Sequence, residues 1–246
     1  MKILVTGATG VLGSLVADEV RTRGLAIRTA ARSGADVVMD LSSGSGLEDA
    51  TTGIDAVIHC ATDPRRHRKV DVAGTRRLLA LAGVPVVLPS IVGCDVIPLG
   101  YYRSKLATEE LVTAHRPGFT ILRATQFHQF VWSLLDRLAR PPLMVVPHDT
   151  RFQVIDPAAV ARILVDAAVT GPSGRLADTG GPFAYDARDL ARSVLTATGR
   201  ERPIFRFNLP GLAGAAFRAG GNLTSRRDQD GETWNEFVSR TVNGQL

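Results

Sequence analysis

The chain has 246 residues, enough to bury a large core in one domain or in one domain with a small lobe. Its 45% hydrophobic content is ordinary for a globular protein, and no apolar run approaches the about 18 residues of a membrane span. The net charge of +5 invites a nucleic-acid interpretation, but the basic residues are scattered, and the one dense run, residues 65–69, has no interleaved aromatic residues. We therefore expect neither a membrane nor a nucleic acid as partner.

Two features bear on the compartment. Cys60 and Cys94 are too few for a disulfide framework, and reduced thiols fit the cytoplasm better. The first strand follows directly after Met1-Lys2, which leaves no room for a signal peptide. We expect a cytoplasmic protein, and because no metal-ligand spacing occurs, no metal site.

A glycine-rich turn links the first predicted strand, 2–6, to the first predicted helix, 11–23. Strand, tight turn and helix form the context that gives a dinucleotide-binding motif its meaning. The first glycine permits the turn, the second lets a pyrophosphate approach the backbone, and the third lets the helix lie close to the strand. The residues expected to bind the pyrophosphate are Gly7, Thr9, Gly10, Val11, Leu12 and Gly13.

Apolar strand-like runs alternate with helical segments through the first half of the chain. The predicted strands are 2–6, 26–31, 36–39, 55–60, 84–90 and 119–123, and the predicted helices are 11–23, 47–52, 71–83 and 101–115. Several strands are continuously apolar, which indicates burial on both faces of a parallel sheet. The pattern predicts an α/β fold with a doubly wound parallel Rossmann sheet and helices on both faces.

After about residue 125, prolines divide the chain into shorter elements. We expect a helix over 158–168, a strand over 175–179 and a helix over 187–198. The predicted organisation is an NAD(P)-binding core, 1–125, followed by a mixed part, 126–246, which completes the sheet and forms a smaller substrate lobe within one compact unit.

The end of the second strand bears on the choice of cofactor. Arg32 and Ser33 stand where an acidic residue would bind the ribose 2′-hydroxyl of NAD, and arginine offers a fork for a 2′-phosphate. This favours NADP over NAD, although Arg32 could also be a solvated surface residue. Asp40 and Leu41, after the third strand, are placed to flank the adenine, and a turn cap is the alternative for Asp40.

A candidate acid–base group follows the fifth strand. Tyr101 and Lys105 are four residues apart, so on a helix they share one face. An ammonium group near a phenol favours the phenolate, which makes the phenol a usable acid or base near neutral pH. Ser90 at the strand end could then orient a substrate oxygen while Tyr101 transfers the proton. Tyr102 is the rival acid but lacks the four-residue spacing.

These motifs together resemble the short-chain dehydrogenase/reductase superfamily, in its extended or atypical, NmrA-like branch. The segments that carry the resemblance are residues 6–13, 55–61, 71–75, 90–93, 101–105 and 121–125, with 177–182 also similar. The resemblance implies Ala61 and Thr62 near the cofactor and Lys105 on the nicotinamide ribose. It also implies a nicotinamide and substrate side lined by Thr125, Gln126, Phe127 and His128. His128 is equally consistent with a core histidine.

Two departures from the family pattern stand out. Ser90 and Tyr101 are eleven residues apart, less than is usual in extended members, and Asp71 stands where many members carry asparagine. Several NmrA-like relatives lack the tyrosine and bind NADP as redox sensors without turnover. This chain keeps the tyrosine and the lysine, which favours an enzyme.

The leading hypothesis is an NADPH-dependent oxidoreductase that moves a hydride between nicotinamide and a small, hydrophobic carbonyl/alcohol substrate. The alternatives are a non-catalytic NADP-binding redox sensor, a quinone or enone reductase, and an epimerase on the same fold. The apolar residues 127–135 fit a hydrophobic substrate, or equally a plain core. The basic run 65–69 could steer an anionic ligand or form a solvated loop, and a homodimer is compatible with the fold.

Overall fold

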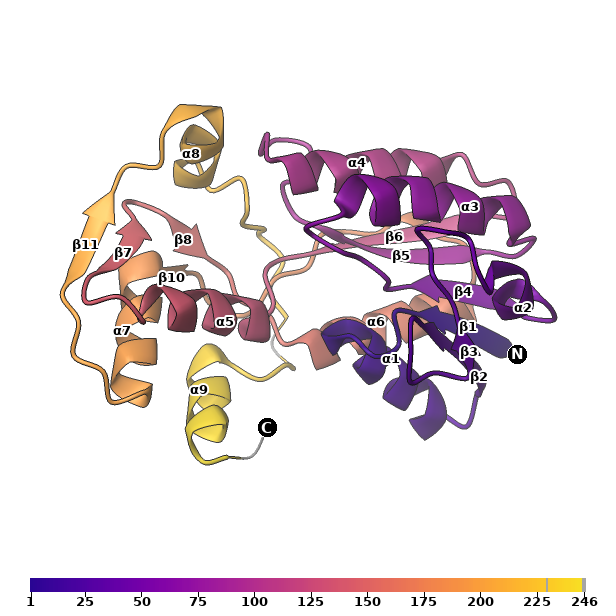
Figure 1. The fold of residues 1–246 in the computed structure, drawn as a ribbon, viewed down its shortest axis with the longest axis horizontal. Helices are drawn as coiled ribbons and strands as arrows, with labels where there is room; N and C mark the ends of the chain where they lie inside the picture. Colours follow the sequence, from indigo (N-terminus) through magenta and orange to yellow (C-terminus); the bar gives the residue numbers. More distant parts are fainter. Residues whose placement is uncertain (229, 245–246) are drawn as a thin grey trace.

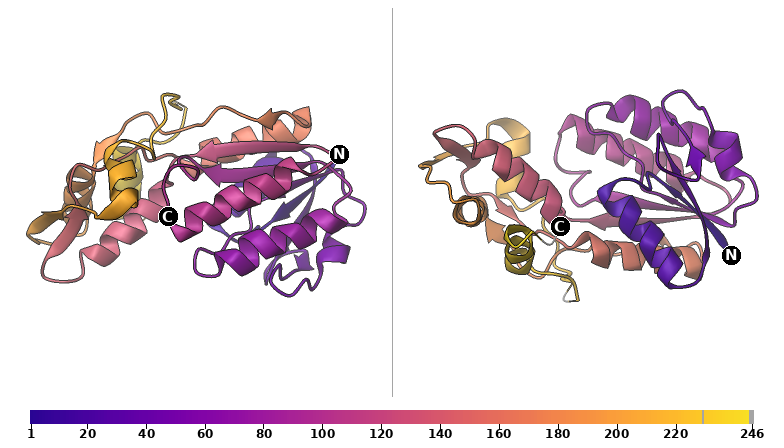
Figure 2. Two further views of the ribbon diagram at one scale, coloured as in Figure 1. Left: turned by 90° about the horizontal axis from the view of Figure 1, so that it is seen from above. Right: turned by 60° about the horizontal axis from the view of Figure 1, so that its bottom comes forward.

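The computed structural model describes residues 1–228 and 230–244. Figure 1 shows a layered α/β core that holds the N-terminus, with a smaller lobe at one end of its sheet. The views in Figure 2 keep the lobe beyond the same end of the sheet. In the described part of the chain, no helix combines the length and the apolar content needed to cross a membrane.

The core is a parallel sheet of seven strands in the order β3-β2-β1-β4-β5-β6-β9. The strands are β1 (Lys2–Thr6), β2 (Ala26–Ala31), β3 (Val37–Val38), β4 (Ala56–His59), β5 (Val86–Ile91), β6 (Phe119–Ala124) and β9 (Gly174–Arg175). The chain starts in the middle and winds outward in both directions, so the order reverses between β1 and β4. In such sheets, ligands bind at the carboxyl ends of the strands at that reversal. The predicted doubly wound fold is confirmed, although β3 and β9 are shorter than expected because only two residues of each pair with the neighbouring strand.

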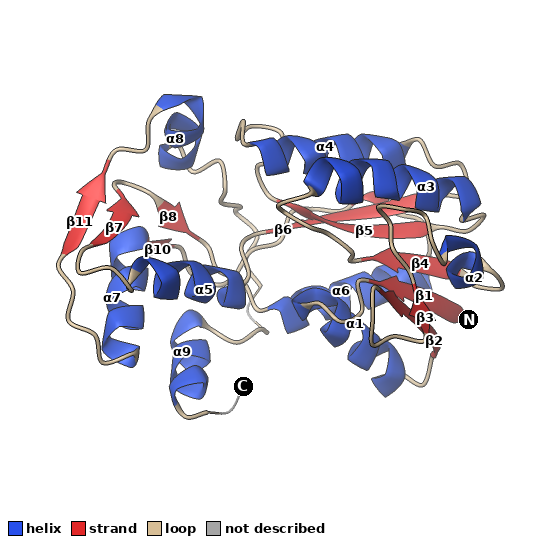
Figure 3. Ribbon diagram, in the orientation of Figure 1, coloured by secondary structure: helices blue, strands red, loops and turns tan. Residues whose placement is uncertain are grey.

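Helices cover both faces of the sheet (Figure 3). One face carries α1 (Val11–Thr22) and α6 (Pro157–Thr170), and the other carries α2 (Leu47–Thr51), α3 (Ala73–Leu81) and α4 (Gly100–Thr113). Successive strand residues point to opposite faces. Ile3 and Val5 accordingly join the apolar cluster with α1 and α6, whereas Leu4 joins the cluster with α2 and α3. The continuously apolar strands are therefore buried on both sides, as predicted.

The helix expected over 71–83 has a different start. A π-helical turn, η1 (Arg68–Val72), precedes α3. Such π-helical turns are rare in proteins, and those that occur are frequently found at functional sites. It includes Asp71, which is fully buried.

The lobe is built from segments that leave the core and return. After β6 the chain enters the lobe as α5 (His128–Leu138), and it goes back to the core as α6 and β9. It re-enters the lobe as α7 (Ala187–Ala197) and ends in α9 (Trp234–Val242). Apolar side chains from these three lobe helices form its core, with Trp234 and Phe237 almost completely buried. The helices expected over 158–168 and 187–198 are confirmed by α6 and α7.

Two small sheets and one further helix complete the lobe. β7 (Met144–Pro147) pairs in parallel with β11 (Ile204–Phe207), and β8 (Arg151–Phe152) pairs antiparallel with β10 (Tyr185–Asp186). Helix α8 (Gly211–Arg218) packs Phe217 against Tyr102 of α4, with ring centroids 6.5 Å apart. It therefore joins the lobe to the N-terminal end of α4.

A buried ion pair fastens α4 to the sheet. Arg123 of β6 donates to both carboxylate oxygens of Glu109 on α4, at 2.8 and 2.7 Å, and to Asp95 at 2.7 Å. Such a bidentate pair fixes orientation as well as distance. Because α4 carries Tyr101 and Lys105, this pair also positions the candidate acid–base group.

We predict that Glu109→Ala lowers the free energy of unfolding by about 3–5 kcal/mol, because it leaves Arg123 buried without its bidentate partner. The matched control is Glu110→Ala, which removes an exposed carboxylate from the next position of the same helix and should change little. Urea denaturation followed by circular dichroism measures both. Equal losses in the two variants would contradict the anchoring role.

Candidate cofactor and acid–base site

The glycine turn after β1 leaves no room for side chains. Gly7 has φ +67°, and a Cβ there would lie 2.6 Å from the Cα of Ala61. A Cβ on Gly13 would lie 2.1 Å from the carbonyl oxygen of Gly7. The helix thus approaches the turn as closely as its backbone allows.

The start of α1 fits an anion. Gly10 caps the helix in an extended conformation, without a side-chain hydrogen bond to the first turn. The first N–H groups of a helix have no partner within it, and they point outward with the positive end of the helix dipole. Thr9, Gly10 and Val11 are exposed, and Leu12 is half-buried. These residues match what a pyrophosphate requires.

The end of β2 lies beside this turn. Arg32 and Ser33 are exposed, and a Cβ on Gly34 would lie 3.6 Å from Cγ2 of Thr9. Within residues 1–228 and 230–244, Arg32 makes no ion pair. A free guanidinium group therefore borders the proposed phosphate site.

Asp40 and Leu41 lie in the turn that follows β3. The carboxylate of Asp40 accepts the N–H of Ser42 at 2.7 Å, so it caps this turn as the alternative interpretation expected. Hydrogen bonds from Ser42 lower the pKa of Asp40, and the charges of Arg66 and Arg32 lower it further. Leu41 is buried in the core. Contact of either residue with adenine stays a prediction.

Tyr101 lies at the start of α4 within a chain of polar contacts. Its hydroxyl is 2.8 Å from Oγ1 of Thr62, and this Oγ1 is 2.5 Å from Oδ1 of Asp71. Lys105 Nζ lies 3.8 Å from the same Asp71 oxygen and donates to the carbonyl of Pro89 at 3.3 Å. Tyr101 and Lys105, expected to share one helix face, thus meet around one buried carboxylate.

The buried lysine dominates the local electrostatics. Burial by itself lowers the pKa of Lys105, but neighbouring Tyr101 and Asp71 raise it, and the net shift is upward. Burial and the charge of Lys105 lower the pKa of His59 to about 3, so this histidine is neutral. Its ring bridges the hydroxyls of Thr6 and Thr75, at 2.7 and 2.9 Å. One positive charge therefore lies under the carboxyl edge of the sheet.

Ser90 lies apart from this network. Its hydroxyl is 3.9 Å from Sγ of Cys94, which in turn donates to Glu109 at 3.3 Å. Ser90 therefore faces the ion pair that fastens α4, and its expected role toward a substrate oxygen stays a prediction. The hydroxyl that contacts Tyr101 belongs to Thr62, which the resemblance placed near the cofactor together with Ala61.

The segment expected to line the substrate side follows β6 at the same edge of the sheet. Oγ1 of Thr125 and Oε1 of Gln126 are buried, and in the described structure neither accepts or donates a hydrogen bond, while the Gln126 amide donates to Tyr102 at 3.2 Å. Phe127 is half-buried. His128 is fully buried, 6.0 Å from the ring of Trp234. The position of His128 favours the core-histidine alternative.

His67 is a neighbour of Tyr101 that sequence reasoning missed. Its Nδ1 lies 2.6 Å from the hydroxyl of Ser104, and its ring centroid is 6.1 Å from that of Tyr101. His67 lies inside the basic run 65–69. The charge of this run suggested a solvated loop, so the packing of His67 was not predicted. No local sequence pattern joins His67 to Ser104 or Tyr101, because the contact depends on how the segment before α3 meets α4.

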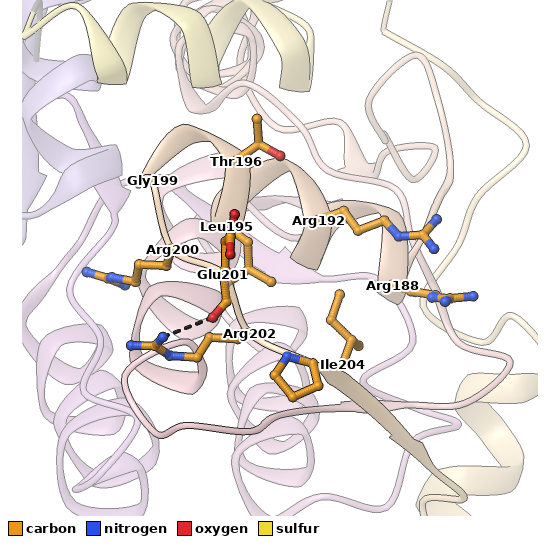
Figure 4. A pocket seen from close by; sticks show the side chains of 10 residues that line it. Arg188, Arg192, Leu195, Thr196, Gly199, Arg200, Glu201, Arg202 and Ile204 are labelled. Atoms are coloured by element: carbon orange, nitrogen blue, oxygen red, sulfur yellow. Dashed lines mark hydrogen bonds between the residues drawn. The ribbon is translucent and has the colours of Figure 1, made fainter.

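A separate hollow of about 840 Å³ lies at the far end of the lobe, beside α7 and β11 (Figure 4). Four of its lining residues are arginines, but Arg188 and Arg192 point to one side and Arg200 and Arg202 to the other. Arg200 is also paired with Asp136 at 2.8 Å. The guanidinium groups do not converge, so the hollow carries no part of the proposed chemistry.

The parallel sheet order and the glycine turn after β1 are those of a Rossmann-type fold. Residues 3–84 match the sequence model of the NAD dependent epimerase/dehydratase family. The match covers about a third of the chain and agrees with the resemblance to the short-chain dehydrogenase/reductase superfamily seen in the sequence. None of the curated proteins matches the chain.

Solved structures of the same fold cover the whole chain. A short-chain dehydrogenase/reductase superfamily protein from Agrobacterium tumefaciens, with bound NAD, is 22% identical, with a TM-score of 0.71 over 100% of this chain and 97% of that one. The UDP-glucose 4-epimerase of Thermus thermophilus in complex with NAD is 19% identical, with a TM-score of 0.72 over 100% of each chain. A dTDP-4-dehydrorhamnose reductase from Clostridium acetobutylicum is 16% identical, with a TM-score of 0.71 over 100% of each chain. At these identities the likeness shows the fold.

We predict that Gly13→Ala abolishes tight NADPH binding, because the new Cβ would push the helix start away from the turn that presents its N–H groups. Gly83→Ala is the matched control, since a Cβ there meets nothing within 4 Å. Fluorescence titration with NADPH measures the affinity, and a melting curve verifies that each variant is folded. Wild-type affinity in Gly13→Ala would remove this turn from the cofactor site.

Proposed function

We propose that the protein is an NADPH-dependent oxidoreductase that transfers a hydride between nicotinamide and a small, hydrophobic carbonyl/alcohol substrate. The observation that carries the proposal is the meeting of Tyr101 and Lys105 at the sheet edge that also presents the glycine turn. Bound there, the cofactor would supply the hydride. The chain itself would supply the proton.

Each residue of the acid–base pair has a distinct task. Tyr101 is the general acid–base, because its half-buried hydroxyl is fixed at the edge of the sheet by Thr62. Lys105 stays charged and would bind the ribose hydroxyls of the nicotinamide side. Its rigid placement under Asp71 and Pro89 supports this task, since a buried, doubly held ammonium group keeps one position.

The preference for NADPH rests on the exposed Arg32 beside the turn, with Ser33 next to it. A guanidinium group can donate two hydrogen bonds to a phosphate, and among the described residues Arg32 forms no ion pair within 4 Å. Arg66 adds a second positive charge on the same side, because the charges of both arginines lower the pKa of the Asp40 carboxyl. This gives the basic run 65–69 a task at the rim of the cofactor site.

The proposed hydrophobic substrate is supported by the wall that α8 adds. Ala213, Ala216 and Phe217 pack with Tyr101 and Tyr102 in one apolar cluster. The segment 125–128 would close the site from the β6 side. A small apolar carbonyl compound fits such a wall better than a charged one.

Epimerisation is a second candidate, favoured by the family match over residues 3–84. In that reaction the cofactor is recycled in place, so no net NADPH is consumed. A product isomer that forms without a change in NADPH absorbance would identify it. A redox sensor, in contrast, would bind NADPH and turn over no carbonyl compound.

We predict that Tyr101→Phe lowers turnover by about 10²–10⁴-fold, the range contributed by a positioned general acid, while NADPH affinity changes little. The assay follows NADPH absorbance with a panel of aldehydes, ketones and quinones. Tyr102→Phe is the control, because it removes the rival hydroxyl from the next position. Wild-type turnover in Tyr101→Phe would remove Tyr101 from the mechanism.

We predict that Arg32→Gln weakens NADPH binding by about 10- to 100-fold, as expected for the loss of charged hydrogen bonds to a phosphate, and leaves NADH affinity unchanged. Arg116→Gln, which changes an exposed arginine in the turn after α4, serves as the charge-matched control. Calorimetric titration with both cofactors measures the ratio. A wild-type protein that strongly prefers NADH would overturn the assignment.

A further inference from the structure

Asp71 is a buried acid that the proposed reaction does not by itself require. It is fully buried, and both of its oxygens are used. Oδ1 accepts a hydrogen bond from the hydroxyl of Thr62 and lies near Lys105. Oδ2 accepts a hydrogen bond from the backbone N–H of Asp63 at 3.1 Å. Two hydrogen-bond donors and one cation are the surroundings of an ionised carboxylate.

The hydrogen bonds run in one direction. A carboxylate only accepts, so the single hydroxyl proton of Thr62 points to Asp71. Thr62 can then only accept from Tyr101, whose hydroxyl is 2.8 Å away. A phenolate has no proton to donate, so this arrangement is made only while Tyr101 is protonated.

The charge at position 71 acts in the same sense. Lys105 is the cation that would favour a phenolate at Tyr101. Asp71, 3.8 Å from Lys105, offsets that cation with a full negative charge, which asparagine at this position could not do. The hydrogen-bond direction and the charge both favour a protonated Tyr101.

We propose that Asp71 is a positioning residue that acts through Thr62 and Lys105 to hold the proton on Tyr101, and so sets this site for carbonyl reduction. The link to carbonyl reduction rests on the proposed function. In reduction, the O–H bond of Tyr101 breaks and a new O–H bond forms on the substrate oxygen, while the substrate carbon gains the hydride supplied by NADPH. The exposed Thr62 gives solvent a route to return the proton to Tyr101.

Other titratable groups surround the pair. Helix α8 contributes apolar side chains to this cluster. Among the described residues, the titratable neighbours on the other segments are His59, His67, Asp63, Cys60 and Cys94, and Tyr102 lies next to Tyr101 on α4. The carboxylate of Asp63 accepts the backbone N–H groups of residues 65 and 66 and is paired with Arg66 at 3.8 Å, so its charge is offset by these partners.

The test is an ultraviolet titration of phenolate formation in the full chain without cofactor or substrate. The chain has three tyrosines; burial raises the pKa of Tyr102 to about 12 and that of Tyr185 above its ordinary value. The transition absent from Tyr101→Phe is assigned to Tyr101. In Asp71→Asn we expect its midpoint to fall by about one pH unit or more. Thr62→Val, which keeps the ion pair, should give a smaller fall in the same direction.

Asp63→Asn is the matched control, because it removes a neighbouring carboxylate that is not hydrogen-bonded to Thr62. In this variant the midpoint of the Tyr101 transition should stay near that of the wild type. A midpoint that is unchanged or raised in folded Asp71→Asn or Thr62→Val protein overturns the proposal, with folding verified by circular dichroism. The titration needs no substrate, so its outcome is independent of whether the protein reduces any carbonyl compound.

Discussion

The burial of one lysine is the constraint on which the site depends. An ammonium group taken from water into a protein interior is costly unless it is paired and hydrogen-bonded. Lys105, with a side chain only 8% exposed, meets that requirement with the carboxylate of Asp71 and the carbonyl of Pro89. These partners come from η1 and β5, so helix α4 can lie in only one position relative to them. Tyr101, one turn earlier on the same helix, is fixed as a consequence.

The surrounding structure supports that position from several sides. The Arg123–Glu109 pair holds α4 against β6, and His67 contacts α4 nearer its start, at Ser104. The glycine turn depends on no side-chain hydrogen bond, because its shape follows from the absence of Cβ atoms at Gly7 and Gly13. The proposed cofactor half of the site is therefore shaped by backbone geometry, and the proposed acid–base half by side-chain charges.

The sequence predicted the features that are local. Continuous apolar strands, helix spacing and the glycine turn led to the doubly wound sheet and to Tyr101 with Lys105 on one helix. The lobe was harder, because its strands are two to four residues long and carry little periodicity. Helix α9 was not predicted, although Thr233 and Glu236 form a capping box at its start, which is a local sequence signal. The network of Thr62 and Asp71 was not predictable, because it depends on how a π-helical turn, a loop and α4 meet in space.

The glycine turn and Asp71 have different proposed roles in the site: the turn gives it shape, and Asp71 gives it a negative charge. A change in the glycine turn alters whether a nucleotide is bound at all, since the turn supplies shape. A change at Asp71 would alter the charge next to Lys105 and, on the proposal made above, the protonation of Tyr101. On the proposals made above, cofactor binding and the protonation state of Tyr101 would thus depend on different residues at one sheet edge. Under these proposals, a chain could keep this fold and its nucleotide site while a single buried carboxylate sets the protonation state of its phenol.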